Sequence, residues 1–196
     1  MYQKQRFIIL KSIKYSESDL IIHALLKTGE KINFIAKGAR KSKKRFSGGV
    51  LEPTHFVEGV FSKTKSDLFL LQEAHLIKGF EKLRTSYDKL ELAFYFLKLI
   101  DQVAEYGGLD SESYFDLLGN SLASLESIDS INNLKLHFEV KFLHYQGVLP
   151  EDQLYSEFLR LNIKDCEKLN YSKSHAQSIS NLVQNHIRQL LPKMNN

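Results

Sequence analysis

The spacing of apolar residues changes near residue 80, and this change constrains the fold more than any other feature of the chain. Before it, apolar and polar residues alternate with the period of two that is typical of strands. Five such runs, separated by polar turns, cover residues 7–15, 20–26, 32–36, 50–61 and 68–77. Five antiparallel strands in this length predict a small closed barrel, because closure leaves no exposed sheet edge. The OB-fold is the commonest barrel of this kind, and an SH3-like barrel would give a similar pattern.

From residue 81 onward, apolar residues recur with the period of a helix. The spacing predicts helices over residues 86–106, 110–125, 131–145, 150–161 and 179–191. Gly107 and Gly108 are expected to end the first helix, and Asp110 to cap the second. The chain is thus expected to be an α+β protein of two domains. An OB-fold barrel would occupy residues 1–80 and a helical bundle residues 81–196.

Charge is divided unevenly between the two expected domains. Residues 1–80 carry 15 Lys and Arg against 7 Asp and Glu, a net charge of +8, whereas residues 81–196 have a net charge of −4. Most of the excess lies in one stretch between the third and fourth strands, at Lys37, Arg40, Lys41, Lys43, Lys44 and Arg45. Like charges this close repel one another, and a polyanion that neutralises them releases its counterions. This basic loop therefore predicts binding of nucleic acid by the barrel.

Phe46 follows the six cations directly, so we expect its ring to stack on a base. Two other interpretations of the loop stay open. A solvated hairpin that only aids solubility would have the same composition, and in a eukaryote the loop would resemble a nuclear-localisation signal. The chain as a whole would alternatively be a protein–protein adaptor. Its helical domain would then bind a partner, and the basic loop would dock an acidic protein.

Motifs of catalysis and metal binding are missing from the sequence. There is no phosphate-binding loop and no Gly-x-Gly-x-x-Gly fingerprint, so we do not expect an enzyme or a bound cofactor. Cys166 is the single cysteine, which excludes an internal disulfide and a zinc site built from several cysteines. His137 and His144 lie roughly 10 Å apart along one predicted helix, too far to share a metal ion. No apolar run of about 18 residues predicts a membrane span.

Several segments resemble the bacterial RecO family of recombination mediators. They are Glu17-Ser18-Asp19-Leu20, Gly29-Glu30-Lys31, Ala36-Lys37-Gly38-Ala39-Arg40 and Gly49-Val50-Leu51-Glu52-Pro53. The similarity continues through Leu83-Arg84, the helix over residues 90–103, and the stretch from Phe138 to Leu143 that precedes Gly147 and Pro150. The segment from Ala36 to Arg40, with the basic stretch after it, is the most specific of these matches.

The resemblance implies an N-terminal OB-fold that binds single- and double-stranded DNA and anneals complementary strands. It also implies two partners, RecR and the acidic C-terminal tail of single-strand binding protein, and a location in the bacterial cytoplasm near the nucleoid. The six cations of the basic loop would be DNA contacts. The rim of a groove for the acidic tail would be formed by Lys135, His137, Lys141 and His144, and a plain solvated helix face is the other interpretation of these residues.

The sequence departs from the family pattern after Pro150. Many members have a four-cysteine zinc site there, whereas Glu151, Asp152 and Gln153 follow in this chain and Cys166 stands alone. We therefore expect the zinc module to be absent or reduced. Functions of the C-terminal part transfer from the family with less support than DNA binding by the barrel.

Overall fold

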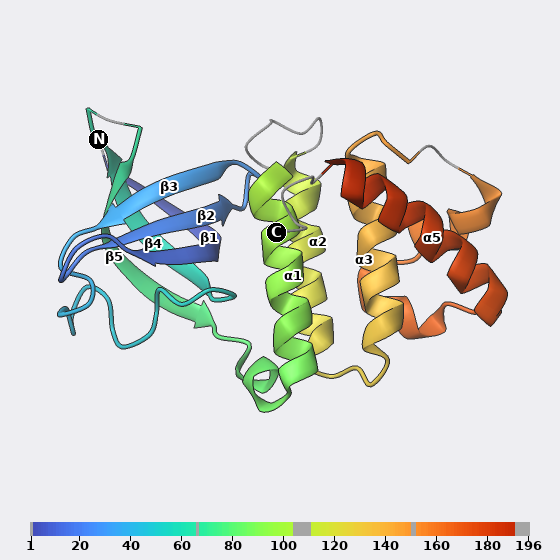
Figure 1. The fold of residues 1–196 in the computed structure, drawn as a ribbon. Coiled ribbons are helices and arrows are strands. Elements are labelled where there is room, and N and C mark those ends of the chain that lie inside the picture. The colour runs from blue at the N-terminus through green and yellow to red at the C-terminus, as the bar shows by residue number, and fades with distance from the viewer. Residues whose placement is uncertain (1, 66, 104–110, 150–151, 191–196) are drawn as a thin grey trace.

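The computed structural model describes residues 2–65, 67–103, 111–149 and 152–190. It shows a β-barrel at one end and a stack of helices at the other (Figure 1). Gly107, Gly108, Asp110 and Pro150, on which some expected helix boundaries depend, lie outside the described residues.

Five strands close into a barrel in the order β1-β2-β3-β5-β4. They are β1 (Tyr2–Lys14), β2 (Leu20–Leu26), β3 (Lys31–Ala36), β4 (Phe56–Lys63) and β5 (Phe69–Lys78). All neighbouring strands are antiparallel except β3 and β5, which run parallel. A five-stranded barrel whose chain crosses over in this way is of the OB type. The predicted fold class, a barrel followed by a helical region, is confirmed.

The fourth strand begins later than its apolar pattern predicts, at Phe56 instead of residue 50. Val50 and Leu51 are only 3% and 5% exposed, but they lie in turns and pack into the barrel core with Phe61 and Leu71. An apolar run marks burial and does not by itself distinguish a strand from a loop that fills the mouth of a barrel.

The first strand has both of its faces covered, which explains its continuous apolar run from Phe7 to Leu10. Phe7 and Ile9 point into the barrel, whereas Ile8 and Leu10 point outward into the helical core. A strand buried on both sides lacks the usual alternation of apolar and polar residues. The outward residues, together with Leu25 of β2, attach the barrel to the helices.

The helical region contains α1 (Tyr87–Val103), α2 (Ser111–Leu125), α3 (Ile131–Tyr145), α4 (Ser156–Arg160) and α5 (Lys173–Leu190). Among the described residues, 3-10 segments lie before α1, at η1 (Glu81–Thr85), and on either side of α4, at η3 (Gln153–Tyr155) and η4 (Ile163–Lys168). Helices α1 and α2 stand against the barrel, and α5 lies at the far end (Figure 1). Within the described residues, no helix combines the length and apolar character needed to cross a bilayer.

Aromatic and polar contacts join the barrel to α1 and α2 in addition to the aliphatic packing. The rings of Phe56 and Phe115 meet edge to face with centroids 5.7 Å apart. The ammonium of Lys31 lies 2.8 Å from the Asp101 carboxylate, and only 5% of the lysine side chain is exposed. Burial raises the pKa of Asp101, but the hydrogen bonds from His23 and Lys31 outweigh it and lower the pKa overall.

Candidate nucleic-acid interface

The basic loop leaves β3 at the end of the barrel away from the helices and is held against the barrel by apolar residues (Figure 1). Ala39 and Phe46 are 8% and 3% exposed and belong to the barrel core. Phe46 forms a parallel bridge with Ala74 of β5, and the Ala74 N–H donates to the carbonyl oxygen of Arg45 (3.0 Å). The loop is therefore fastened near both of its ends.

Burial of Phe46 corrects one prediction made from the sequence. Its ring was expected to stack on a base, but it packs into the barrel core and is only 3% exposed. The Arg45 guanidinium lies over the ring, 5.4 Å from its centroid. Phe46 anchors the loop. An aromatic residue beside cations has the same sequence signature in either role.

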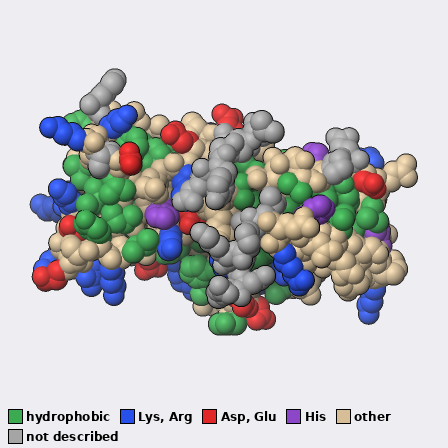
Figure 2. Space-filling model, turned by 45° about the horizontal axis from the view of Figure 1, so that its top comes forward, with side chains coloured by type: hydrophobic (Ala, Val, Ile, Leu, Met, Phe, Trp, Pro, Cys, Tyr) green, Lys and Arg blue, Asp and Glu red, His purple; other side chains and the backbone are tan. Residues whose placement is uncertain are grey.

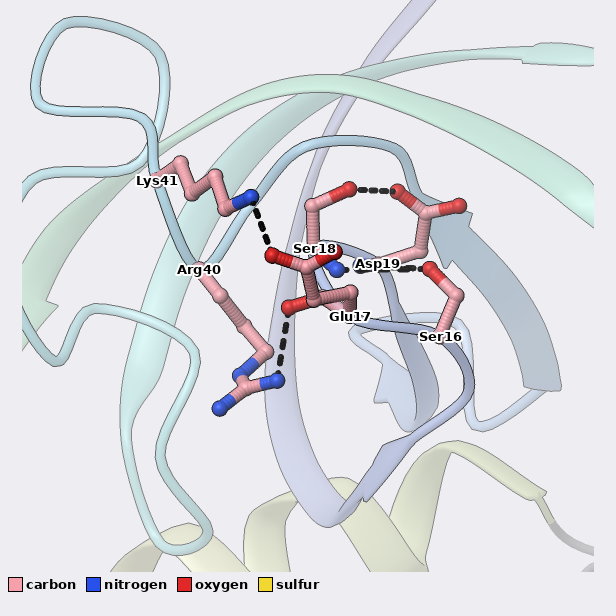
Figure 3. Close-up of polar contacts among 6 residues, drawn as sticks. All are labelled: Ser16, Glu17, Ser18, Asp19, Arg40 and Lys41. Carbon is pink, nitrogen blue, oxygen red and sulfur yellow. Dashed lines mark hydrogen bonds and ion pairs between the residues drawn. The ribbon is translucent and has the colours of Figure 1, made fainter.

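The turn between β1 and β2 holds the start of the loop (Figure 3). The Asp19 carboxylate accepts a hydrogen bond from the Gly38 N–H (2.8 Å) and another from the Ser18 hydroxyl (3.0 Å). These bonds, that from Gly38 first, hold the pKa of Asp19 below its ordinary value. Gly38 has a φ of +67°, a conformation that favours glycine at this position. Sequence reasoning did not assign this role to Asp19, although an acid in a serine-rich turn between strands is its signal.

Glu17 in the same turn contacts two of the six cations (Figure 3). Its carboxylate lies 2.7 Å from the Lys41 ammonium, and its carbonyl oxygen accepts a hydrogen bond from the Arg40 guanidinium (2.7 Å). Glu17 and Lys41 have side chains 85% and 65% exposed. Such an exposed pair contributes about 0–1 kcal/mol, so a phosphate can displace the carboxylate at little cost.

The other four cations differ in how much they support the loop. The Arg45 guanidinium donates to the carbonyl oxygen of Lys37 (2.9 Å) and so closes the loop on itself. Lys43 and Lys44 are exposed and make no hydrogen bond or ion pair with the described residues. All six basic residues face the solvent. Figure 2 shows Lys and Arg side chains concentrated on the barrel half of the molecule.

Helix α3 does not present the expected cationic rim, which is a second correction. His137 is fully buried, and its Nε2 donates to the carbonyl oxygen of Phe158 (2.7 Å). Lys141 is 9% exposed and donates to the carbonyl oxygen of Leu159 (2.9 Å). Burial lowers the pKa of both groups, that of His137 to about 4. Neighbouring segments bury the part of α3 from Leu136 to Leu143, so His137 and Lys141 bind main-chain carbonyls instead of a partner.

The two remaining members of that rim do not form a site together. The side chain of Lys135 is 43% exposed, and its ammonium lies 5.2 Å from the centre of the Tyr95 ring. His144 is half-buried, and its Nδ1 donates to the carbonyl oxygen of Leu149 (3.1 Å). Cys166 is buried, and burial raises the pKa of its thiol. In the described parts of the chain, no three His, Cys, Asp or Glu side chains are placed to hold a metal ion.

Comparison with known proteins adds to the geometry. Residues 1–80 match the family model described as recombination protein O, N terminal. A protein from Syntrophus aciditrophicus, named DNA repair protein RecO, is 35% identical over 150 residues, which are 75% of this chain and 56% of the relative. Proteins of the same name from Alkaliphilus metalliredigens and Clostridium acetobutylicum are 31% and 28% identical over 76% and 90% of this chain.

These matches cover 60% of the Alkaliphilus protein and 66% of the Clostridium protein, so the chain spans a little over half the length of its curated relatives. Matches of 150 residues or more are longer than the 80 residues of the family model, so they extend beyond the barrel into the helical region. Together, the OB-type barrel, its basic loop and the matches show that the chain belongs to the RecO family.

Proposed function

We propose that this chain binds DNA through the basic loop and acts in recombinational DNA repair, where it brings complementary single strands together. One observation carries the proposal, namely that six exposed cations are displayed on a loop that the barrel holds in place. A loop anchored at Phe46 and Gly38 loses less conformational entropy on binding than a free tail does. The names of its relatives, DNA repair protein RecO, agree with this role.

The mechanism of annealing is electrostatic. Two complementary strands repel each other through their phosphates, and the basic loop lowers this repulsion when both strands lie near it. No bond is made or broken in the process, so no catalytic side chain is required. Single- and double-stranded DNA both present phosphates to the loop, so we propose that both bind.

We also propose RecR and the acidic C-terminal tail of single-strand binding protein as partners, as family membership implies. Two of the residues expected to contact the tail are buried in the structure. His137 and Lys141 face inward, so a site for the tail has to use other residues. Fluorescence polarisation of a labelled tail peptide, titrated with the whole chain, tests this partner directly.

DNA binding is tested with the double variant Lys43→Ala/Lys44→Ala. These two lysines have no partner among the described residues, so their loss leaves the loop fold intact, whereas Arg45 also closes the loop. Each lost phosphate contact lowers the salt slope of single-strand binding by about 0.7. The double variant should reduce the slope by about 1.4 and weaken binding roughly 25-fold at 0.1 M salt.

The matched control is Lys164→Ala/Lys173→Ala, which removes the same charge from two exposed lysines of the helical region. Fluorescence anisotropy of a labelled oligonucleotide at several salt concentrations gives both quantities. Equal slopes for the two double variants would reject the loop as the DNA site. If the wild-type chain failed to bind random-sequence DNA while an acidic protein bound the loop, the adaptor function would replace this proposal.

A further inference from the structure

Tyr15 is the exposed aromatic residue that lies next to the basic loop. Its side chain is 66% exposed, in contrast to Phe46 at 3%. It stands one residue beyond β1, and its N–H donates to the carbonyl oxygen of Asp19 (3.1 Å). The same turn binds Arg40 through Glu17 (Figure 3). The turn therefore joins the aromatic residue to the cations.

The ring of Tyr15 continues an apolar row on the outer face of the barrel. Ile13 pairs with Ile21, Ile21 with Ile35, and Ile35 with Leu70, so these four aliphatic residues cross four strands side by side. The sequence neighbours of Ile21, Ile35 and Leu70 that belong to the barrel core are Ile22, Phe34, Ala36 and Leu71, so these three residues point outward. Ile13 is paired with Ile21 and lies on the same face. Tyr15 lies two residues beyond Ile13 and therefore on the same face. Hydrophobic side chains gather on the barrel in Figure 2.

Positive charge borders this row on the loop side. The β2–β3 register pairs Leu20 with Ala36 and places Asp19 opposite Lys37, on the same outer face as Tyr15. The N–H of Gly38, the residue after Lys37, donates to the Asp19 carboxylate (2.8 Å), so Lys37 lies beside the turn that carries Tyr15. An aromatic and aliphatic surface next to cations matches single-stranded DNA, in which phosphates alternate with unpaired bases.

We propose that Tyr15 stacks on an unpaired base of a single strand whose phosphates bind the basic loop. This inference rests on the DNA binding proposed above and adds a preference for single strands to it. A base inside a duplex is already stacked on its neighbours and cannot offer its face to Tyr15. The loop attracts any polyanion, whereas Tyr15 selects the unpaired strand.

The chain contains no tryptophan, which makes a direct test possible. Tyr15→Trp introduces a single tryptophan at the proposed stacking position, and its emission can be excited selectively at wavelengths that tyrosine does not absorb. Saturating oligothymidylate should quench its emission, while a duplex of equal length should leave it close to the unbound level. Tyr87→Trp is the control, since Tyr87 is 78% exposed but lies in the helical region. Equal changes in the emission of the two variants on addition of oligothymidylate would overturn the proposal. Quenching of Tyr15→Trp by an acidic peptide, with no quenching by oligothymidylate, would also overturn it.

Affinity gives an independent measurement. Tyr15→Ala should weaken binding of oligothymidylate about 5- to 150-fold, because aromatic stacking contributes about 1–3 kcal/mol per base. The salt slope should not change, since no cation is lost, and Tyr15→Phe should retain the affinity. If Tyr15→Ala bound oligothymidylate like the wild type while Lys43→Ala/Lys44→Ala bound weakly, stacking would be wrong and the basic loop would still be the DNA site. If the wild type bound no DNA, the proposed function itself would fail.

Discussion

Replacement of Phe46 by alanine separates the anchoring role from the role expected from the sequence. The side chain is 3% exposed and packs with the barrel core, so the substitution removes a fully buried ring. Phe→Ala changes in cores cost about 3–5 kcal/mol. A loop can partly collapse into the space that is left, so we expect the low end, about 3 kcal/mol. For a chain of this size the melting temperature should fall by about 6–12 °C.

Urea unfolding followed by circular dichroism measures this loss, and DNA affinity is measured below the transition on the same samples. All six cations remain in Phe46→Ala, so the salt slope should stay close to that of the wild type. Phe46→Leu keeps most of the apolar volume and should recover most of the stability. An unchanged unfolding free energy, together with a large loss of single-strand affinity, would show that the ring stacks on DNA and would refute the anchoring role.

Three other predictions follow from contacts of single side chains. Glu17→Gln frees the Lys41 ammonium and should tighten DNA binding, with a salt slope steeper by about 0.7. The unfolding free energy should change by less than about 1 kcal/mol. Weaker binding in anisotropy titrations would contradict this prediction. Asp101→Asn removes the carboxylate that lies 2.8 Å from the buried Lys31 ammonium and should cost about 3 kcal/mol in denaturant unfolding, whereas a change within experimental error would mean that the pair does not join barrel and helices. His137 has a pKa of about 4 when folded, below its unfolded value of 6.5, so its contribution is complete above pH 6.5 and is lost as the pH falls toward 4. The unfolding free energy should drop by about 2 kcal/mol between pH 7 and pH 5, and His137→Gln should lose this part of the dependence.

The strands and helices follow from the sequence where burial and period coincide. Apolar residues alternate along β3 and recur at helical spacing along α3, because each is a regular element whose surroundings stay the same along its length. The start of β4 was misplaced because Val50 and Leu51 are buried from a loop, and the sequence records burial without recording backbone conformation. The proposed boundary near residue 80 rests on the same change of period and stays a prediction.

The roles of single polar and aromatic residues depend on neighbours that are distant in sequence. Phe46 is buried because Ala74 of β5, far along the chain, comes beside it. His137 faces inward because the segment around Phe158 covers α3. The charge of the basic loop could be recognised from sequence, since no distant residue can bury six adjacent cations cheaply. The proposed role of Tyr15 could not be recognised from the sequence, because it depends on the strand register that places Lys37 across from Asp19.

The aliphatic residues that β1 turns toward the helices have a consequence for the history of this architecture. Ile8 and Leu10 are covered by α1 and α2, so a barrel separated from these helices would expose an apolar strip and would tend to aggregate. The barrel cannot be recombined freely with unrelated proteins, as a self-contained module can. Substitutions on the outer side of β1 and on the helices that cover it should therefore be inherited in compensating pairs. The basic loop, at the end of the barrel away from the helices, is free to vary independently of them.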